Sequence, residues 1–224
     1  MALITNVIKG SDAKRLLLLV HGYGADERDL GGILPYLDPD GTFAVVLPRG
    51  PIAVPGTPGF AWYDFGAENP EAAFNAAVDE LDDLLDTACE EQGFAREEAV
   101  VGGFSQGAGV TLALALRASD RPRPLAVLAM SPALPGPIDV RARVPVLVQH
   151  GTYDPLVPVQ RSRDLARTLR KQGVPTVYRE YRMEHQVARE SLQDARAWLE
   201  RLFAGEMPDE EVPEDPIELV PPVT

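Results

Sequence analysis

Apolar runs alternate with amphipathic stretches along most of this 224-residue chain. Runs of aliphatic and β-branched residues predict strands. These runs are Leu3–Ile8, Arg15–Val20, Phe43–Leu47, Ala99–Gly103, Leu125–Met130, Val144–Gln149 and Thr176–Tyr181. The middle five are almost continuously hydrophobic. Such strands are buried on both faces, which is typical of a parallel sheet covered by helices on each side.

Helical spacing of apolar residues dominates between these runs. The predicted helices are Glu27–Leu37, Glu71–Gln92, Gln106–Ser119, Val159–Gln172 and Val187–Phe203. Gly93 and Gly173 stand where the second and fourth helices would need a C-terminal cap. The alternation of strand and helix over residues 1–204 predicts one doubly wound α/β domain, with a mostly parallel sheet of about seven strands.

The last twenty residues, 205–224, differ in composition from the rest. They contain seven acidic residues, five prolines and no lysine or arginine. Such a segment cannot bury enough apolar surface to order itself, so we expect a mobile or loosely docked tail. The net charge of the chain is −13, which argues against nucleic acid as the main partner.

Few features suggest secretion or a membrane. The N-terminus lacks the basic start and long apolar stretch of a signal peptide, and the run Leu16–Val20 is too short to span a bilayer. Cys89 is the only cysteine and lies in a predicted helix, where packing is the simplest role for it. These features predict a cytoplasmic protein without integral membrane association.

Polar residues follow several predicted strands, at the sheet edge where α/β proteins place their active sites. The pentapeptide Gly103-Phe104-Ser105-Gln106-Gly107 reads G-x-S-x-G between a predicted strand and a predicted helix. That context is typical of a nucleophile elbow, a sharp turn that lifts a serine hydroxyl above the sheet. Flanking glycines are needed because side chains there would strike the neighbouring strand and helix.

A serine hydroxyl needs a base, and the base needs a carboxylate to orient it. Ser105, Asp154 and His185 stand in the order Ser, Asp, His that α/β-hydrolases use, and the last two are on loops that follow strands. His21 and His150 also follow strands, but each precedes a glycine, where a histidine more often shapes a turn. The alternatives are that Asp154 is a turn residue before proline and that His185 is a solvated loop residue.

Acyl transfer also needs donors for the oxyanion that develops on the substrate. One predicted donor is the backbone N–H of Gln106, the residue after the nucleophile. The other is the backbone N–H of Tyr23, in the early turn His21-Gly22-Tyr23-Gly24. The tyrosine side chain is not needed for this role.

Taken together, several motifs resemble the phospholipase/carboxylesterase family, which includes acyl-protein thioesterases and is related to dienelactone hydrolases. They are Leu19–Gly24, Trp62-Tyr63-Asp64, Gly103–Gly107 and His150–Pro158, within a resemblance that runs from about Leu16 to Phe203. The resemblance implies a compact α/β-hydrolase fold without a large lid domain. It further implies a serine nucleophile, hydrolysis of small-molecule esters or thioesters, and no cofactor. Many relatives self-associate, so a homodimer stays open, although no interface is evident here.

The substrate site is expected on two loops. Trp62, Tyr63 and Phe65 lie on a long loop rich in proline and glycine, where Trp62 should border the acyl site. For Tyr63 and Phe65, anchoring of the loop is an equal alternative. Leu156 and Val157 could add an apolar wall. Two departures from the family pattern are Glu184, where glycine commonly precedes the histidine, and the residues just before Trp62.

Overall fold

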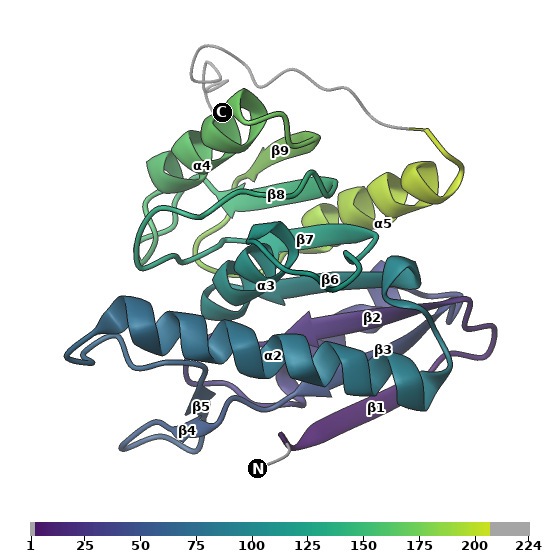
Figure 1. The fold of residues 1–224 in the computed structure, drawn as a ribbon. Helices are drawn as coiled ribbons and strands as arrows, with labels where there is room; N and C mark the ends of the chain where they lie inside the picture. Colours follow the sequence, from purple (N-terminus) through teal and green to yellow (C-terminus); the bar gives the residue numbers. More distant parts are fainter. Residues whose placement is uncertain (1–2, 207–224) are drawn as a thin grey trace, which may run out of the picture.

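Seven strands form one sheet in the computed structural model, which describes residues 3–206 (Figure 1). Their order is β1-β3-β2-β6-β7-β8-β9. The bounds are β1 Thr5–Lys9, β2 Arg15–Val20, β3 Phe43–Pro48, β6 Ala99–Phe104, β7 Ala126–Met130, β8 Val146–Gly151 and β9 Thr176–Tyr181. Only β1 runs antiparallel to its neighbour, β3, and the other six are parallel. The predicted doubly wound, mostly parallel sheet is therefore confirmed.

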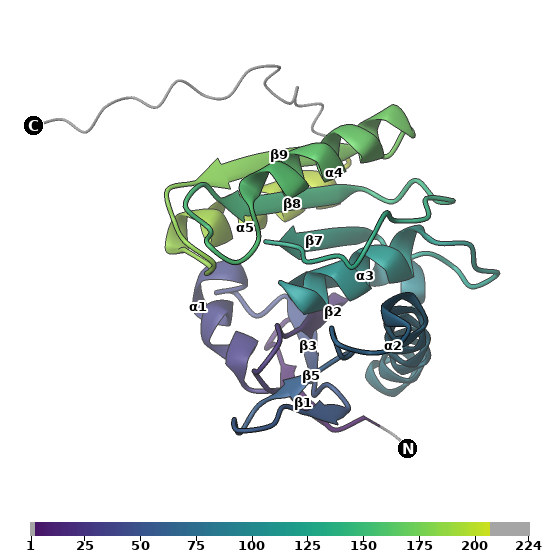
Figure 2. The same ribbon diagram turned by 90° about the vertical axis from the view of Figure 1, so that its left-hand side faces the viewer.

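Helices cover both faces of the sheet, as the view along it shows (Figure 2). One face carries α2 (Pro70–Gln92), α3 (Gln106–Leu116) and α4 (Val159–Lys171). The other carries α1 (Leu34–Leu37) and α5 (Arg189–Phe203). Each side has its own buried apolar layer, and the side chains of β2 alternate between the two, Leu16 and Leu18 in one and Leu17 and Leu19 in the other.

Two local predictions need correction. The predicted helix Glu27–Leu37 is a 3₁₀ turn, η1 (Asp29–Ile33), followed by the single turn of α1. Gly31 and Gly32 explain why the longer helix does not form, since each glycine costs a helix about 1 kcal/mol relative to alanine. A small hairpin, β4 (Ile52–Ala53) with β5 (Phe60–Ala61), was not predicted, because two-residue strands carry no periodic signal.

The hairpin is tied to the loop that follows β2. Gly24 N–H donates to the Phe60 carbonyl and Phe60 N–H donates to the Ala25 carbonyl, each at 2.8 Å. A Cβ on Gly59 would collide with the carbonyl of Gly24, so the two loops pass too closely for any other residue at position 59. This contact fixes the loop after β2 against the segment that leads to Trp62.

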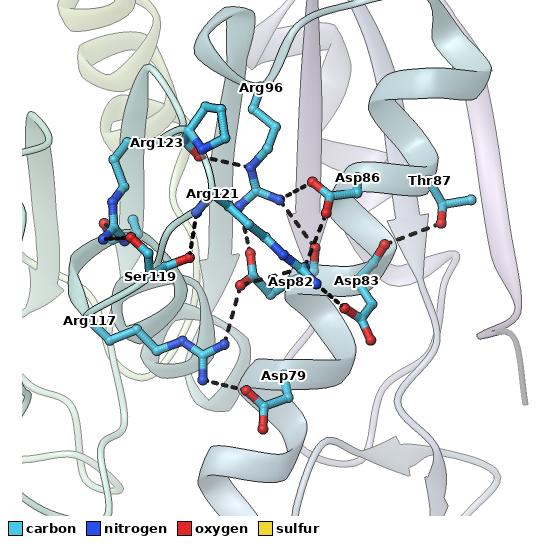
Figure 3. A network of polar contacts seen from close by, with 12 residues as sticks. Asp79, Asp82, Asp83, Asp86, Thr87, Arg96, Arg117, Ser119, Arg121 and Arg123 are labelled. Atoms are coloured by element: carbon cyan, nitrogen blue, oxygen red, sulfur yellow. Dashed lines mark hydrogen bonds and ion pairs between the residues drawn. The ribbon is translucent and has the colours of Figure 1, made fainter.

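A cluster of carboxylate and guanidinium groups lies on α2 and on the segments that precede β6 and follow α3 (Figure 3). We call it the α2 network; it comprises Asp79, Asp82, Asp83, Asp86, Arg96, Arg117 and Arg121. Asp82 is at its centre, with one carboxylate oxygen on Arg96 and the other 3.2 Å from Arg117. Arg96 is 7% exposed and Asp82 is 3% exposed, whereas the outer members reach solvent. The network joins α2 to the segments that flank β6 and α3.

The predicted tail begins at residue 205, and its residues 207–224 lie outside the described part of the chain. Within residues 3–206, no helix is long and apolar enough to cross a membrane.

Candidate active site

Ser105 occupies a strained turn between β6 and α3. Its φ is 53° and its ψ is −116°, a conformation that side chains other than glycine rarely adopt. A Cβ on Gly103 would lie 2.6 Å from the Gly107 carbonyl carbon, and a Cβ on Gly107 would collide with the carbonyls of Val20 and His21. Both glycines of G-x-S-x-G are thus required by close backbone contacts, as a nucleophile elbow demands.

Asp154 and His185 meet beside this turn. His185 Nδ1 lies 2.6 Å from Asp154 Oδ2, and the imidazole packs on Phe104, the neighbour of Ser105, with ring centroids 4.7 Å apart. The chain around His185 crosses β8 so closely that a Cβ on Gly151 would collide with the carbonyls of Met183 and Glu184. The structure therefore brings together two side chains that are 31 residues apart, at the edge that carries Ser105.

The Asp154 side chain is fully buried and is held on both oxygens. Oδ1 accepts the backbone N–H groups of Leu156 and Val157 at 2.9 and 2.8 Å. Burial alone would raise the pKa of Asp154, but donation from Val157, His185 and Leu156 outweighs it and keeps the pKa below the ordinary value. The group is therefore an anion at neutral pH, and its turn geometry aims Oδ2 at His185.

The loop after β2 passes directly over Ser105. A Cβ on Gly22 would lie 3.3 Å from the Ser105 Cβ, so only glycine fits there with ease. His21 is buried and holds this loop: its Nε2 accepts the Gly50 N–H at 2.9 Å, which leaves the proton on Nδ1, 2.6 Å from the Gly22 carbonyl oxygen. Because C=O and N–H point in opposite directions across a trans peptide, this bond turns the Tyr23 N–H away from His21.

Trp62 and Tyr63 lie deeper than their loop position suggested. Trp62 is 1% exposed and Tyr63 is 0% exposed. The Trp62 indole N–H donates to the His21 carbonyl at 2.9 Å, and the amide side chain of Gln106 accepts the Trp62 N–H and donates to the Tyr63 carbonyl. Sequence reasoning missed this role of the Gln106 side chain, since no local pattern links residues 43 positions apart.

Exposed aromatic and aliphatic side chains surround the strand ends. Phe65 is 51% exposed and lies between Tyr23 and Tyr63. Its ring is tilted against Tyr23, with centroids 5.6 Å apart, and meets Tyr63 edge-on, with centroids 5.2 Å apart. On the opposite side, Leu156 is 72% exposed and Tyr153 is 55% exposed, whereas Val157 is buried. Large apolar groups are thus presented to solvent on both sides of the site, where a ligand can cover them.

Glu184, the unusual neighbour of His185, is exposed. The third histidine, His150, is fully buried and touches Asp154, with Nε2 3.2 Å from Oδ2. All three histidines of the chain therefore lie at the same edge of the sheet, two of them buried. Among residues 3–206 there is no cluster of three or more histidine, cysteine or acidic side chains that could hold a metal ion.

Several known proteins resemble this chain in sequence and in fold. A model of the Phospholipase/Carboxylesterase family matches residues 4–203. MhqD of Bacillus subtilis (strain 168) is 29% identical, over 86% of this chain and 96% of its own length. Acyl-protein thioesterase 1 of Debaryomyces hansenii is 28% identical, over 74% of this chain and 75% of its own.

Two solved structures extend the likeness to the fold. The esterase PE8 is 27% identical and superposes with a TM-score of 0.80, covering 90% of this chain and 100% of that one. The Bacillus cereus carboxylesterase is 25% identical with a TM-score of 0.78, covering 90% and 95%. No lid domain interrupts the fold within the described residues 3–206.

Proposed function

Because the chain belongs to the phospholipase/carboxylesterase family of α/β-hydrolases and is an esterase or thioesterase, we propose that it cleaves small to medium acyl esters or thioesters through a covalent intermediate on Ser105. The observation that carries this proposal is that a strained, glycine-flanked serine and a hydrogen-bonded His185–Asp154 pair lie at the same sheet edge, where His185 packs on Phe104, the neighbour of Ser105.

In the first step, Ser105 Oγ attacks the carbonyl carbon of the substrate, and its proton passes to His185 Nε2. The carbonyl π bond becomes an oxyanion. His185 then gives the proton to the leaving alcohol or thiol as the C–O or C–S bond breaks, which leaves the acyl group on Ser105. Asp154 accepts the Nδ1–H of His185, so that Nε2 is the nitrogen free to take the proton.

In the second step, water attacks the acyl-enzyme. His185 takes a proton from the water, a second oxyanion forms, and Ser105 Oγ leaves and recovers its proton from His185. The products are the carboxylic acid and the free enzyme. No cofactor enters either step.

The oxyanion donors in this mechanism are the N–H groups of Tyr23 and Gln106. Gln106 is the first residue of α3, where backbone N–H groups have no partner inside the helix and the helix dipole favours negative charge. The bond from His21 to the Gly22 carbonyl supports the outward direction of the Tyr23 N–H. Two such donors typically contribute about 10²-fold or more each to the rate.

The apolar side chains around the site favour an acyl or alcohol group that is itself apolar. We assign the exposed Phe65 and Leu156 to direct contact with the substrate, and Val157 to the wall behind Leu156. Trp62 and Tyr63 remain predicted substrate neighbours, although their burial makes shaping the floor of the site their main contribution. A substrate with a charged acyl group would leave this apolar rim without a partner.

The thiol of Cys89 is a poor alternative nucleophile. It is buried in α2, and burial raises its pKa to about 11, so almost none of it is thiolate at neutral pH. A cysteine-dependent hydrolase would carry its cysteine at the elbow, where this chain has Ser105.

Labelling with a fluorophosphonate probe tests the proposal directly. The modified peptide should contain Ser105, and Ser105→Ala should abolish both labelling and turnover of short p-nitrophenyl esters while the circular dichroism spectrum is unchanged. Cys89→Ala is the matched control and should keep full activity. Turnover in Ser105→Ala at the wild-type rate would refute the assignment, and failure of the wild-type protein to label would favour a binding protein without catalysis.

A preference for long acyl chains is the second candidate, because a relative is named acyl-protein thioesterase. The rate measured against acyl chain length, from C2 to C16, separates the two. A maximum at C2 to C8 supports the small to medium range, and a maximum at C12 or beyond supports a lysophospholipase or protein deacylase.

A further inference from the structure

A second histidine contacts the carboxylate that holds His185. His150 Nε2 lies 3.2 Å from Asp154 Oδ2 and 2.8 Å from the Val157 carbonyl oxygen. On the other side of the ring, Nδ1 lies 2.7 Å from Ser162 Oγ on α4. The ring is fully buried, and Ser162 is 1% exposed. Both ring nitrogens are thus satisfied inside the protein.

These partners fix the tautomer of His150. Carbonyl and carboxylate oxygens only accept, so Nε2 must carry the proton. It donates to the Val157 carbonyl, and Asp154 Oδ2 lies 3.2 Å from the same nitrogen as an electrostatic contact. Nδ1 then presents a lone pair, and the Ser162 hydroxyl donates to it. Burial is the largest influence on the His150 ring and lowers its pKa, against the opposite effects of the Val157 carbonyl and Asp154. His150 is therefore a neutral donor at the pH where the enzyme works.

The charged groups around His150 leave Asp154 as its polar target. Glu180 of β9 also faces the ring, but Arg163 of α4 binds both oxygens of that carboxylate, at 2.6 and 2.8 Å. His185 lies beyond Asp154 and acts on His150 only through space. Asp154 Oδ2, 3.2 Å from His150 Nε2, is thus the carboxylate oxygen closest to the ring among residues 3–206.

Resting on the proposed function, we propose that His150, held by Ser162, is a positioning residue that fixes the carboxylate of Asp154 for His185. Asp154 Oδ1 is anchored by two backbone N–H groups, whereas Oδ2 would otherwise be held by His185 alone. By donating to the Val157 carbonyl while its Nε2 stays 3.2 Å from Oδ2, His150 holds the Asp154–Val157 turn and stops the carboxylate from turning. It also draws charge from Oδ2, so that His185 releases its proton more readily to the leaving group.

Substitutions at position 150 separate this role from packing. In His150→Leu, kcat for a p-nitrophenyl ester should fall about tenfold, which corresponds to loss of the hydrogen bond to Val157 together with the electrostatic contact to Oδ2, while KM changes little. The acid limb of kcat/KM against pH should move to higher pH, because the unshared carboxylate holds the imidazolium proton more tightly. In His150→Gln the amide can donate from the position of Nε2, so it should recover most of both effects.

Ser162→Ala should act in the same direction as His150→Leu but more weakly, since it loosens the ring without removing the donor. A folded His150→Leu enzyme with the wild-type kcat and pH profile would overturn the proposal. Equal losses in His150→Leu and His150→Gln, with the acid limb unmoved, would also overturn it and assign His150 to packing alone. Thermal unfolding of each variant shows that the folded state is being compared.

A readout without turnover is available because the chain has only three histidines. Long-range ¹H–¹⁵N spectra of ¹⁵N-histidine-labelled protein should show His150 neutral and protonated on Nε2 from pH 6 to 8, and a charged or Nδ1-protonated ring contradicts the proposal. If Ser105→Ala keeps turnover, the proposed function fails while this tautomer still stands. If Ser105→Ala is inactive and His150→Leu is normal, only the positioning role fails.

Discussion

Two polar networks lie at opposite ends of α3, and they are built from different chemistry. The proposed catalytic edge, around Ser105 and His185, centres on one carboxylate, Asp154, which is surrounded by imidazole rings and backbone N–H groups. The α2 network contains four aspartates and three arginines in direct contact (Figure 3). Both central carboxylates are deeply buried, since the side chains of Asp154 and Asp82 are 0% and 5% exposed.

The difference shows what each network does. Guanidinium groups neutralise charge strongly and hold segments together, but one beside Asp154 would compete with His185 for the carboxylate. Neutral donors satisfy the oxygens of Asp154 without removing its pull on the imidazole. We infer that the catalytic edge is built to position a proton path and that the α2 network is built to hold the fold. Substitutions at the catalytic edge should therefore change activity, and substitutions in the α2 network should change stability.

The largest effect is expected from Asp154→Asn. The amide has nearly the same shape, but its NH₂ can donate where Asp154 accepts, so it favours the wrong tautomer of His185. We expect kcat to fall about 10⁴-fold in a stopped-flow or plate assay with a p-nitrophenyl ester. Chemical denaturation should show little loss of stability. A fall smaller than tenfold would mean that Asp154 does not orient the base.

The matching change in the α2 network is Arg96→Met. It removes the buried partner of one oxygen of Asp82, and Arg117, 3.2 Å from the other oxygen, compensates only in part, so the free energy of unfolding should fall by about 3 kcal/mol. Activity per folded molecule at low temperature should stay at the wild-type value. Arg121→Met is the control within the same network, because its partly exposed guanidinium should cost less than about 1 kcal/mol. Similar losses in both variants would remove the distinction between centre and rim.

Lowering the pH should reduce the stability of the fold at the loop after β2, because it protonates Glu27. Its carboxylate lies on Arg49 with Nε–Oε2 at 2.5 Å, and the hydrogen bond from Arg49 lowers its pKa to about 2 from the ordinary 4.5. A lowered carboxylate pKa stabilises the fold above the unfolded-state pKa, and this contribution is lost as pH falls from about 4.5 to about 2. The gap in stability between wild type and Glu27→Gln should be about 2 kcal/mol at pH 6 and should close by pH 2.

Urea midpoints measured from pH 2 to pH 7 test this window. A gap that stays constant with pH would show that the Glu27–Arg49 pair acts through packing and not through charge. Arg49 precedes Gly50, whose N–H donates to the His21 ring. Loss of the Glu27–Arg49 pair should therefore also loosen the loop after β2.

The smallest effect concerns Trp62→Phe. The substitution keeps most of the buried ring but removes the indole N–H that donates to the His21 carbonyl. Loss of one neutral hydrogen bond corresponds to about 0.5–1.5 kcal/mol, so kcat should fall about threefold to tenfold. The ratio of rates for C2 and C8 esters should hardly change, since Trp62 is buried beneath the site. A changed ratio would restore Trp62 to direct substrate contact.

Much of this protein could be predicted from local patterns. Apolar runs located all seven strands of the main sheet to within about two residues. The central strands are buried on both faces, which leaves an unbroken hydrophobic signature, whereas β1 is largely exposed. The pentapeptide around Ser105 predicted a tight turn, and a Cβ on Gly103 would indeed collide with Gly107 and Ala108 of the same turn. The pairing of Asp154 with His185 was expected from chain order, and the two side chains do meet.

Tertiary structure decided what depends on residues distant in sequence. The burial of Trp62 and Tyr63, the amide bridge from Gln106 and the contact of His150 with Asp154 all join separate segments. A histidine before a glycine reads the same in a sequence whether it shapes a turn or supports a carboxylate. Only packing fixes which groups face its two nitrogens, so the sequence determined the reactive groups and the structure determined how they are held.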